Sequence, residues 1–373
     1  MIHRSDAKIL ILNSRQTLRP FGNDAWITNT EKAVLESKER GAIILTSIGM
    51  SSWEMTLYLA SRHKVRLMIY IPLAPDENAD RVTKGIIEGF HLDDGLIGWR
   101  FLECDKKRSK KSNFQELRDR TMMREADLIF PVSIRSGGNL DEQLRMARAN
   151  GAAVEDNFRV EYQRDHRICK ISVDKNKIDP EIDMLLDDYL IHWTKSSNGP
   201  WPGETSFQFY QAIAGCEDHY ARSALDTLIR IVLERKLRAS SRHYRTEYPA
   251  VPFSSLKPSA AAALMRWRAR YQEMTFEPYG IAIRADFAEK LSIKRVFYGH
   301  RDMYQYLDTE DRPYFQNMGI RGDWTPEKEY RHIGDLDLSK LRSDDSILIV
   351  NHAEERDRFR DISDLPVVSY YSR

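Results

Sequence analysis

The second half of the chain carries a histidine and a threonine whose spacing suits contact with a ribose. His192 and Thr194 occupy alternate positions in LIHWTKSSNGPWPG (190–203), and alternate residues of a strand share one face. An imidazole donates to or accepts from a sugar hydroxyl, and a threonine hydroxyl adds a second polar contact. The alternative is a histidine that packs in the core beside Trp193. Taken by itself, the motif favours this alternative.

A second motif places two carboxylates beside an arginine. Glu327 and Glu329 alternate with Lys328 and Tyr330 in WTPEKEYRHIGDLDLS (324–339), as on a strand, where a carboxylate would face the same side as Arg331. A paired glutamate and arginine is usually structural. A glutamate in a cleft can instead stabilise a developing cation or act as a base.

Small and polar residues follow the predicted strands of the first half, where ligands of open α/β sheets bind. Small residues let the backbone approach a phosphate, a helix N-terminus offers free N–H groups, and an arginine adds a fork for an anion. Neither GxGxxG nor GxxxxGK[ST] is present, and ordinary tight turns are the alternative. The candidate ligand-binding residues are Ser14, Arg15, Ser47, Gly49, Met50, Arg135, Ser136, Gly137, Gly138 and Asn139.

Two local patches are basic although the whole chain is not. Residues 105–124 hold eight Lys and Arg against three acidic residues, and residues 230–245 hold six against one. Basic groups interleaved with aromatic residues, as in RWRARY (266–271), suit a single-stranded nucleic acid. The alternatives are a solvated loop and an exposed helix face. The candidate nucleic-acid contacts are Lys106, Lys107, Arg108, Arg238, Arg242, Arg266 and Arg268.

The elements that must position these residues differ between the two halves. The run KILILNS (8–14) is apolar on both faces, as expected of a strand buried in a parallel sheet. Strands that alternate with helices are typical of βαβ units and a doubly wound sheet. Residues 1–165 are therefore predicted to form a Rossmann-like α/β domain. Its further strands are predicted at 42–50, 65–73, 124–134 and 152–158, and its helices at 27–40, 53–63 and 139–151.

The alternation is lost in the second half. We predict a linker over 166–185 and an α+β domain over 186–373. The periodicity predicts a long helix at 217–237. Short strands are predicted at 250–254, 279–284, 295–299 and 346–350.

Composition excludes several classes of protein. The 373 residues are 42% hydrophobic and 30% charged, which is typical of a soluble globular chain of about two domains. A net charge of +1 excludes a global basic field. Three cysteines without a CxxC pair predict neither a disulfide framework nor a structural zinc site, so no metal is expected. We expect a cytoplasmic protein because no signal peptide and no membrane helix is evident. A homo-oligomer is compatible with the sequence.

Two segments of the first half resemble the SLOG/DprA-like Rossmann superfamily. They are SIGMSSWE (47–54) and ADLIFPVSIRSGGNLDEQLRMARANGAAV (126–154). The resemblance implies binding of a nucleotide-derived ligand in a bacterial conflict system. LOG-type hydrolases of this superfamily carry PGGxGTxxE, but here Ser136 and Leu140 replace two of its residues. Plain ligand binding is therefore favoured over a nucleotide hydrolase that would use Glu54 or Glu142.

The motifs of the second half resemble, in their order over residues 186–350, an ADP-ribosyltransferase of the DarT type. The resemblance implies NAD as cofactor, with His192 holding the nicotinamide ribose. It implies Glu329 as the catalytic carboxylate, with Glu327 as the second choice. An aromatic residue would stack on nicotinamide. The implied cofactor contacts are His192, Thr194, Phe253, Ser254 and Tyr279, with Tyr279 preferred for stacking.

Two hypotheses follow. The first is an NAD-dependent ADP-ribosyltransferase, or an NAD-cleaving enzyme, that is regulated by a nucleotide-sensing Rossmann domain in anti-phage defence. Its target would be a DNA, an RNA or another molecule. The second is a DprA-like protein that binds single-stranded nucleic acid and is not an enzyme.

Overall fold

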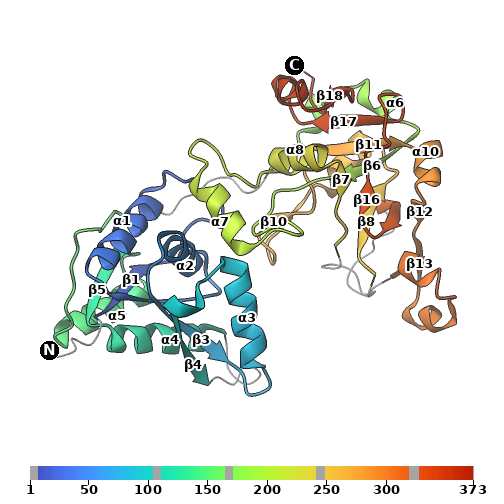
Figure 1. Ribbon diagram of the computed structural model, residues 1–373. Helices are drawn as coiled ribbons and strands as arrows, with labels where there is room; N and C mark the ends of the chain where they lie inside the picture. The colour runs from blue at the N-terminus through green and yellow to red at the C-terminus, as the bar shows by residue number, and fades with distance from the viewer. Residues whose placement is uncertain (1–6, 104–110, 164–170, 241–247, 319–326, 373) are drawn as a thin grey trace. The chain divides into compact units, whose positions relative to one another are not determined.

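The computed structural model describes residues 7–103, 111–163, 171–240, 248–318 and 327–372 (Figure 1). The chain forms two compact units. The first contains residues 1–167 and 199–221, and the second contains 168–198 and 222–373. Residues 199–221, which the sequence analysis grouped with the second domain, thus belong to the first unit. The reason is the apolar face of α7 (Ser206–Ala214), whose Phe209, Tyr210 and Ile213 are buried in the core of that unit.

The first unit is built on a parallel sheet of five strands in the order β4-β3-β2-β1-β5. β1 is covered on both faces, as the sequence predicts, because Ile9, Leu10, Ile11 and Leu12 alternate between the two faces and are all apolar. The strand order reverses at β1, whose neighbours are β2 and β5. This confirms the α/β class. The strands are β1 (Lys8–Asn13), β2 (Ile43–Ser47), β3 (Leu67–Leu73), β4 (Ile97–Glu103) and β5 (Leu128–Ser133).

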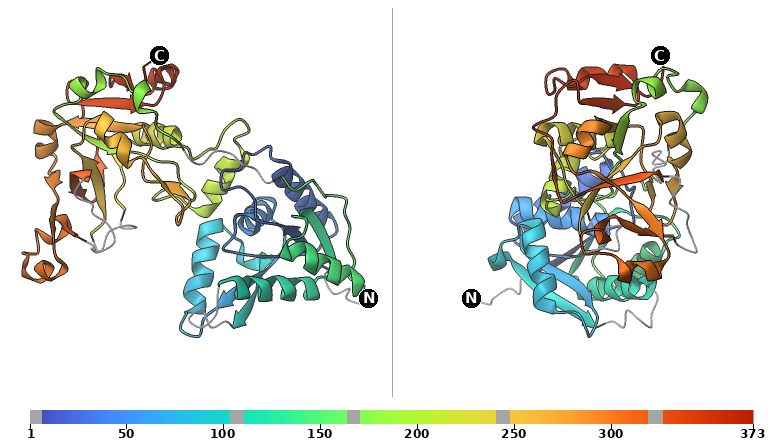
Figure 2. Two further views of the ribbon diagram at one scale, coloured as in Figure 1. Left: turned by 180° about the vertical axis from the view of Figure 1, so that it is seen from behind. Right: turned by 90° about the vertical axis from the view of Figure 1, so that its right-hand side faces the viewer.

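Helices cover both faces of this sheet (Figure 1 and Figure 2). One apolar cluster joins β1 to α1, α2, α3 and α7, and a second cluster on the other face includes residues of α4 and α5. The expected strand at 152–158 does not form, and Val154 makes only an isolated bridge to Ile129. The helices are α1 (Ala25–Glu39), α2 (Ser51–His63), α3 (Ala79–Phe90), α4 (Lys111–Glu125) and α5 (Asn139–Ala149).

The second unit contains a mixed sheet of seven strands in the order β12-β15-β8-β6-β11-β17-β18. Neighbouring strands are antiparallel except β17 and β18. The seam between β6 and β8 is short, with Ile191 and Ser254 as its one registered pair. The strands are β6 (Tyr189–Trp193), β8 (Ala250–Ser254), β11 (Gly280–Arg284), β12 (Lys294–Arg295), β15 (Glu329–Ile333), β17 (Ser346–Val350) and β18 (Val367–Ser369).

Short helices pack on both faces of this sheet. α8 (Ala224–Glu234) and α10 (Ala285–Lys290) contribute to one apolar cluster, and α6 (Ile182–Leu185) contributes to the other. The helix predicted at 217–237 is shorter because Ser223 caps its start and Arg235 adopts a left-handed conformation at its end. The strand predicted at 295–299 divides between β12 and β13 (Phe297–Gly299), which pairs with β14 (Phe315–Asn317). No helix in the described ranges is long and apolar enough to cross a membrane.

Candidate functional site

The loops after β1 and β5 meet at the point where the strand order of the first unit reverses. The backbone N–H of Ser14 donates to the carbonyl of Ser133 at 2.8 Å, and that of Arg135 donates to Ser14 Oγ at 2.9 Å. The side chains of Arg15 and Arg135 are exposed. Neither guanidinium has a hydrogen-bond or ion-pair partner within the described residues. The structure therefore brings together two of the predicted ligand loops and leaves two cations at their junction.

The glycine turns of these loops are closed by acidic side chains. Gly49 and Gly137 have φ of +86° and +68°, the left-handed region that favours glycine. The N–H of Gly49 donates to Glu54 Oε1 at 2.9 Å, and that of Gly137 donates to Asp141 Oδ2 at 3.0 Å. Free N–H groups were expected here, but carboxylates of the following helices already fill them. A bound phosphate would have to displace these carboxylates, so the arginines are the better anion donors.

Some of the other predicted ligand-binding residues in these loops have hydrogen-bond partners within the protein, and others are exposed. Ser47 is buried, and its hydroxyl donates to the Tyr70 carbonyl at 2.7 Å. Glu54 also accepts from the Tyr210 hydroxyl at 2.7 Å, so both of its oxygens are held. Met50 precedes α2 as its N-cap. The exposed positions are Ser136 and Asn139, while Gly138 is partly buried.

In the second unit, His192 is held at the seam between β6 and β8. Its Nδ1 lies 2.7 Å from the Pro252 carbonyl oxygen. A carbonyl only accepts, so Nδ1 carries the proton and Nε2 of the neutral ring is an acceptor. Burial lowers the pKa of His192, which favours this neutral form. The ring thus presents an acceptor, to which a ribose hydroxyl could donate.

The other residues assigned to the cofactor have structural partners. Thr194 is buried, and its Oγ1 lies 3.2 Å from the Ala224 carbonyl oxygen. The Ser254 hydroxyl donates to the Glu327 carbonyl at 2.6 Å. Phe253 and Tyr279 are 2% and 8% exposed in the core. Neither ring has an open face, so the stacking role implied for them finds no support here.

Glu329 and Arg331 form a buried, two-pronged ion pair on β15. Nε and Nη2 of Arg331 donate to Oε1 and Oε2 of Glu329 at 2.7 and 2.9 Å. The remaining N–H groups of Arg331 donate to the carbonyls of Pro313 and Phe315 and to Gln316 Oε1. Arg331 is 1% exposed. The sequence left open whether a glutamate of this motif pairs with Arg331, and in the structure Glu329 forms that pair.

Glu327 has the properties expected of an acid or base. Burial and the neighbouring Glu329 raise its pKa to about 7, while Arg268 and Arg266 act in the opposite direction. Lys328 has a φ of +43°, so the strand alternation expected here begins only at Glu329. The sequence interpretation ranked Glu329 first, whereas protonation near neutral pH belongs to Glu327.

The register of the sheet separates His192 from Glu329. Ile191 pairs with Ser254, and Ser254 pairs with Glu329, so these residues share one face. His192 is the next residue along β6 and points to the other face, where its ring lies 5.7 Å from that of Phe253. His192 and Glu329, the two predicted catalytic residues, therefore lie on opposite faces of the sheet.

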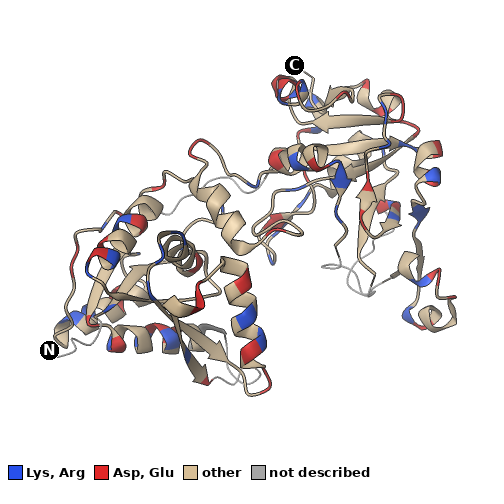
Figure 3. Ribbon diagram, in the orientation of Figure 1, with Lys and Arg blue, Asp and Glu red and all other residues tan. Residues whose placement is uncertain are grey.

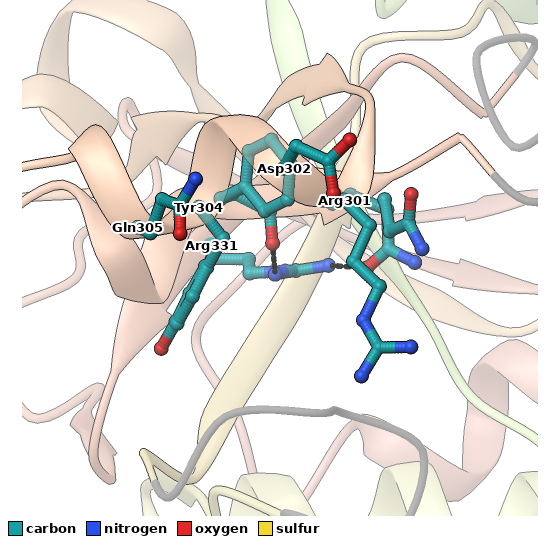
Figure 4. Close-up of a pocket in the computed structure, with 8 residues that line it drawn as sticks. Arg301, Asp302, Tyr304, Gln305 and Arg331 are labelled. Atoms are coloured by element: carbon teal, nitrogen blue, oxygen red, sulfur yellow. Dashed lines mark hydrogen bonds between the residues drawn. The ribbon is translucent and has the colours of Figure 1, made fainter.

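A pocket that the sequence analysis did not anticipate adjoins Glu329. It has a volume of about 590 Å³ and belongs to the second unit. Figure 4 shows the guanidinium of Arg331 inside it, hydrogen-bonded to lining residues, and that of Arg301 without such a bond. The only sequence signal is the aromatic and polar run FYGHRDMYQY (297–306). The lining residues are Arg301, Asp302, Tyr304, Gln305, Phe315, Gln316, Asn317 and Arg331.

The predicted nucleic-acid contacts are only partly placed. Arg238 pairs with Glu234 at 2.8 Å, and Arg230 pairs with the same glutamate at 2.7 Å, so this helix face is not a free basic patch. Figure 3 likewise shows acidic residues among the basic ones on α8. Arg266 and Arg268 lie at and beside β9 (Trp267–Arg268) and act on Glu327. Residues outside the described ranges are Lys106, Lys107, Arg108 and Arg242.

Comparison with known proteins gave similarity to solved structures only. No family model and no curated protein matches the chain. DNA processing protein A from Helicobacter pylori, whose single-stranded DNA binding mode was described, is 15% identical with a TM-score of 0.30 over 40% of this chain and 63% of that one. DprA from Streptococcus pneumoniae is 11% identical with a TM-score of 0.31 over 40% of this chain and 49% of that one. The match therefore spans less than two thirds of either protein.

Proposed function

We propose that the second unit cleaves NAD and transfers ADP-ribose to an acceptor, under the control of a nucleotide-derived ligand held by the first unit. The observation that carries this proposal is the cluster of Glu327, Glu329 and Arg331. One carboxylate of the cluster titrates near neutral pH, and the other is fixed in position. Cleavage of a glycosidic bond uses two carboxylates in such distinct roles.

The chemistry requires a ribose with positive charge at C1′. The bond between C1′ and the nicotinamide nitrogen breaks, and its electron pair leaves with neutral nicotinamide. Glu329, fixed by Arg331, would accept a hydrogen bond from the ribose and orient it. The acceptor, or water, attacks C1′ and gives its proton to the Glu327 carboxylate. The pKa of about 7 suits this base at neutral pH.

The pocket beside Arg331 is the proposed entry for the acceptor. Tyr304 and Phe315 supply aromatic surface, and the amide groups of Gln305 and Asn317 supply paired donors and acceptors. Arg301 adds an exposed cation. Aromatic faces, amides and an arginine are the groups that recognise an unpaired nucleotide. A single-stranded nucleic acid is therefore the proposed acceptor class.

The purified chain with labelled NAD tests the reaction. We expect nicotinamide release that single-stranded DNA or RNA stimulates, and a loss of roughly 100-fold or more in Glu327→Gln and Glu329→Gln. Glu289→Gln, an exposed glutamate of the same unit, serves as the control and should retain activity. His192→Gln is measured in parallel, because a comparable loss would place its ring in the reacting centre.

The second hypothesis, a binding protein without catalysis, predicts a different result. Binding of single-stranded nucleic acid would weaken linearly in log affinity with log salt. Glu329→Gln would leave that binding unchanged. Such behaviour together with no nicotinamide release from any substrate would replace the enzymatic proposal with this one.

For the first unit, we propose that Arg15 and Arg135 hold the phosphate of a nucleotide-derived ligand. Titration calorimetry of the full chain with NAD, ADP-ribose and cyclic nucleotides should find a ligand whose affinity falls roughly tenfold or more in Arg135→Ala. Lys38→Ala, in the last turn of α1 and exposed, is the matched control. Equal affinities in both variants would exclude the arginine site.

A further inference from the structure

Three metal-ligating side chains converge in the segment that follows α7 in the first unit. Within the described residues, Cys216, Asp218 and His219 form the group whose donor atoms all lie within 4.8 Å of one another. Cys216 Sγ lies 3.3 Å from His219 Nδ1 and 3.7 Å from Asp218 Oδ1. His219 Nδ1 lies 2.7 Å from Asp218 Oδ1. None of these residues takes part in the sites described above.

These separations are close to those of a tetrahedral zinc site. Zn–S of about 2.3 Å and Zn–N or Zn–O of about 2.0–2.2 Å place ligand atoms roughly 3.3–3.6 Å apart. The two distances from sulfur already agree within about 0.2 Å. Only the Asp218–His219 contact must open, by about 0.6 Å. The Asp218 side chain is 87% exposed and the His219 side chain 44% exposed, so this adjustment meets little packing.

Both ends of the segment are anchored, which limits the entropy lost on binding. The Cys216 carbonyl accepts from the Gly22 N–H at 2.6 Å. A Cβ at Gly22 would lie 2.4 Å from the Ala214 carbonyl oxygen, so the two backbones are in close contact. Tyr220, one residue beyond His219, is buried in the core of the first unit. The ligands are thus carried by a short stretch that is held at either side.

The electrostatic setting also suits a cation. α7 ends at Ala214 with Gly215 as its C-cap, so Cys216 follows the negative end of the helix dipole. Thiolate, imidazole and carboxylate together are donors that Zn²⁺ accepts, and Ca²⁺ or Mg²⁺ would not select the sulfur. We propose that Cys216, Asp218 and His219 bind a Zn²⁺ ion with its fourth position open. The absence of a CxxC pair led to the opposite expectation, but C-E-D-H (216–219) is a different donor set.

Cobalt substitution in the full chain tests the site. Added Co²⁺ should produce the near-ultraviolet thiolate-to-cobalt band and the visible bands of tetrahedral cobalt, at one ion per chain. Cys216→Ser should abolish the thiolate band, and His219→Ala should weaken Zn²⁺ affinity, measured by competition with a chelating dye, by roughly tenfold or more. Glu217→Gln, between the ligands, should behave as the unchanged chain.

A second readout does not depend on absorption. Zn²⁺ should raise the melting temperature of the unchanged chain and of Glu217→Gln but not of His219→Ala, because a ligand that binds only the folded state stabilises it. If Cys216→Ser does not fold, Asp218→Asn and His219→Ala still decide the outcome. A thiolate band that persists in Cys216→Ser would assign the metal to another cysteine, and the absence of any band would remove the site altogether.

Discussion

Glu327 and Glu329 are two residues apart in sequence, and their surroundings give them different chemistry. Arg331 donates hydrogen bonds to both carboxylate oxygens of Glu329. Glu327 is partly buried, and the carboxylate of Glu329 is its neighbour. The raised pKa of Glu327, about 7 against an ordinary 4.5, is also a statement about stability. Between these two values the folded chain binds the proton more tightly than the unfolded chain. Stability is therefore lost as the pH rises from about 4.5 to about 7.

Glu327→Gln removes this loss because the amide does not titrate. A fully buried group with this shift would contribute about 3 kcal/mol, and partial solvent screening reduces the value to about 1–2 kcal/mol. The variant should therefore match the unchanged chain in the free energy of unfolding near pH 4 and exceed it by that amount near pH 8. Urea unfolding at the two pH values measures the difference. A difference that stays constant with pH would contradict the raised pKa.

At the residue scale, the sequence predicted which side chains to examine but not their roles. The EKEYR pattern (327–331) predicted a carboxylate beside Arg331, and Glu329 forms that pair. It could not show that Lys328 breaks the alternation with a positive φ, or that Phe253 and Tyr279 lie in the core. Burial and proton affinity depend on tertiary neighbours such as Arg266 and Arg268, which come from a distant segment.

At the scale of elements, the strands with apolar sequences were predicted well, whereas β4, whose sequence is mixed and partly exposed, was not. β1, β2 and β5 each contain a short apolar run that ends in small polar residues, which is typical of a strand covered on both faces. β4 is a partly exposed edge strand with the mixed sequence IGWRFLE, and no strand was predicted there. The helix before it, α3, was not predicted either, because charged residues interrupt its apolar positions. α8 was predicted too long because its caps, Ser223 and Arg235, are conformational features that periodicity does not report.

Two glycines of the first unit should respond oppositely to alanine. Gly85 lies within α3, and a Cβ there would meet nothing within 4 Å, so Gly85→Ala should stabilise by about 0.5–1 kcal/mol. Gly22→Ala would place its Cβ 2.4 Å from the Ala214 carbonyl oxygen, which should cost about 1–3 kcal/mol. Thermal unfolding measures both changes, and limited proteolysis should cut Gly22→Ala more readily at the end of α7. Equal behaviour of the two variants would argue against the close contact of Gly22 with this helix.

At the scale of the whole molecule, the chain does not divide at a single point. The first unit is discontinuous in sequence: residues 168–198 belong to the second unit, and residues 199–221 belong to the first again. A sequence boundary between 165 and 186 followed the change in composition, and composition does not report which unit an amphipathic helix joins. The segment that follows α7 carries the proposed zinc ligands, so they also belong to the first unit.

This division predicts that residues 1–165 do not make a complete folding unit. Without α7, the apolar surface that Phe209, Tyr210 and Ile213 cover on α2 and α3 is exposed to water. Burial of a large apolar side chain contributes about 1.5–3 kcal/mol, so three such losses are comparable to the stability of a whole domain. A fragment of residues 1–165 should therefore bind a hydrophobic fluorescent dye and unfold without a cooperative transition, whereas the same fragment joined through a flexible linker to residues 199–221 should bind less dye and unfold cooperatively. The longer fragment with Phe209→Ala, Tyr210→Ala and Ile213→Ala is the control, because it keeps the length and should behave as the short one. A stable, cooperative fragment of residues 1–165 would mean that α7 is an accessory of this fold and not part of its core.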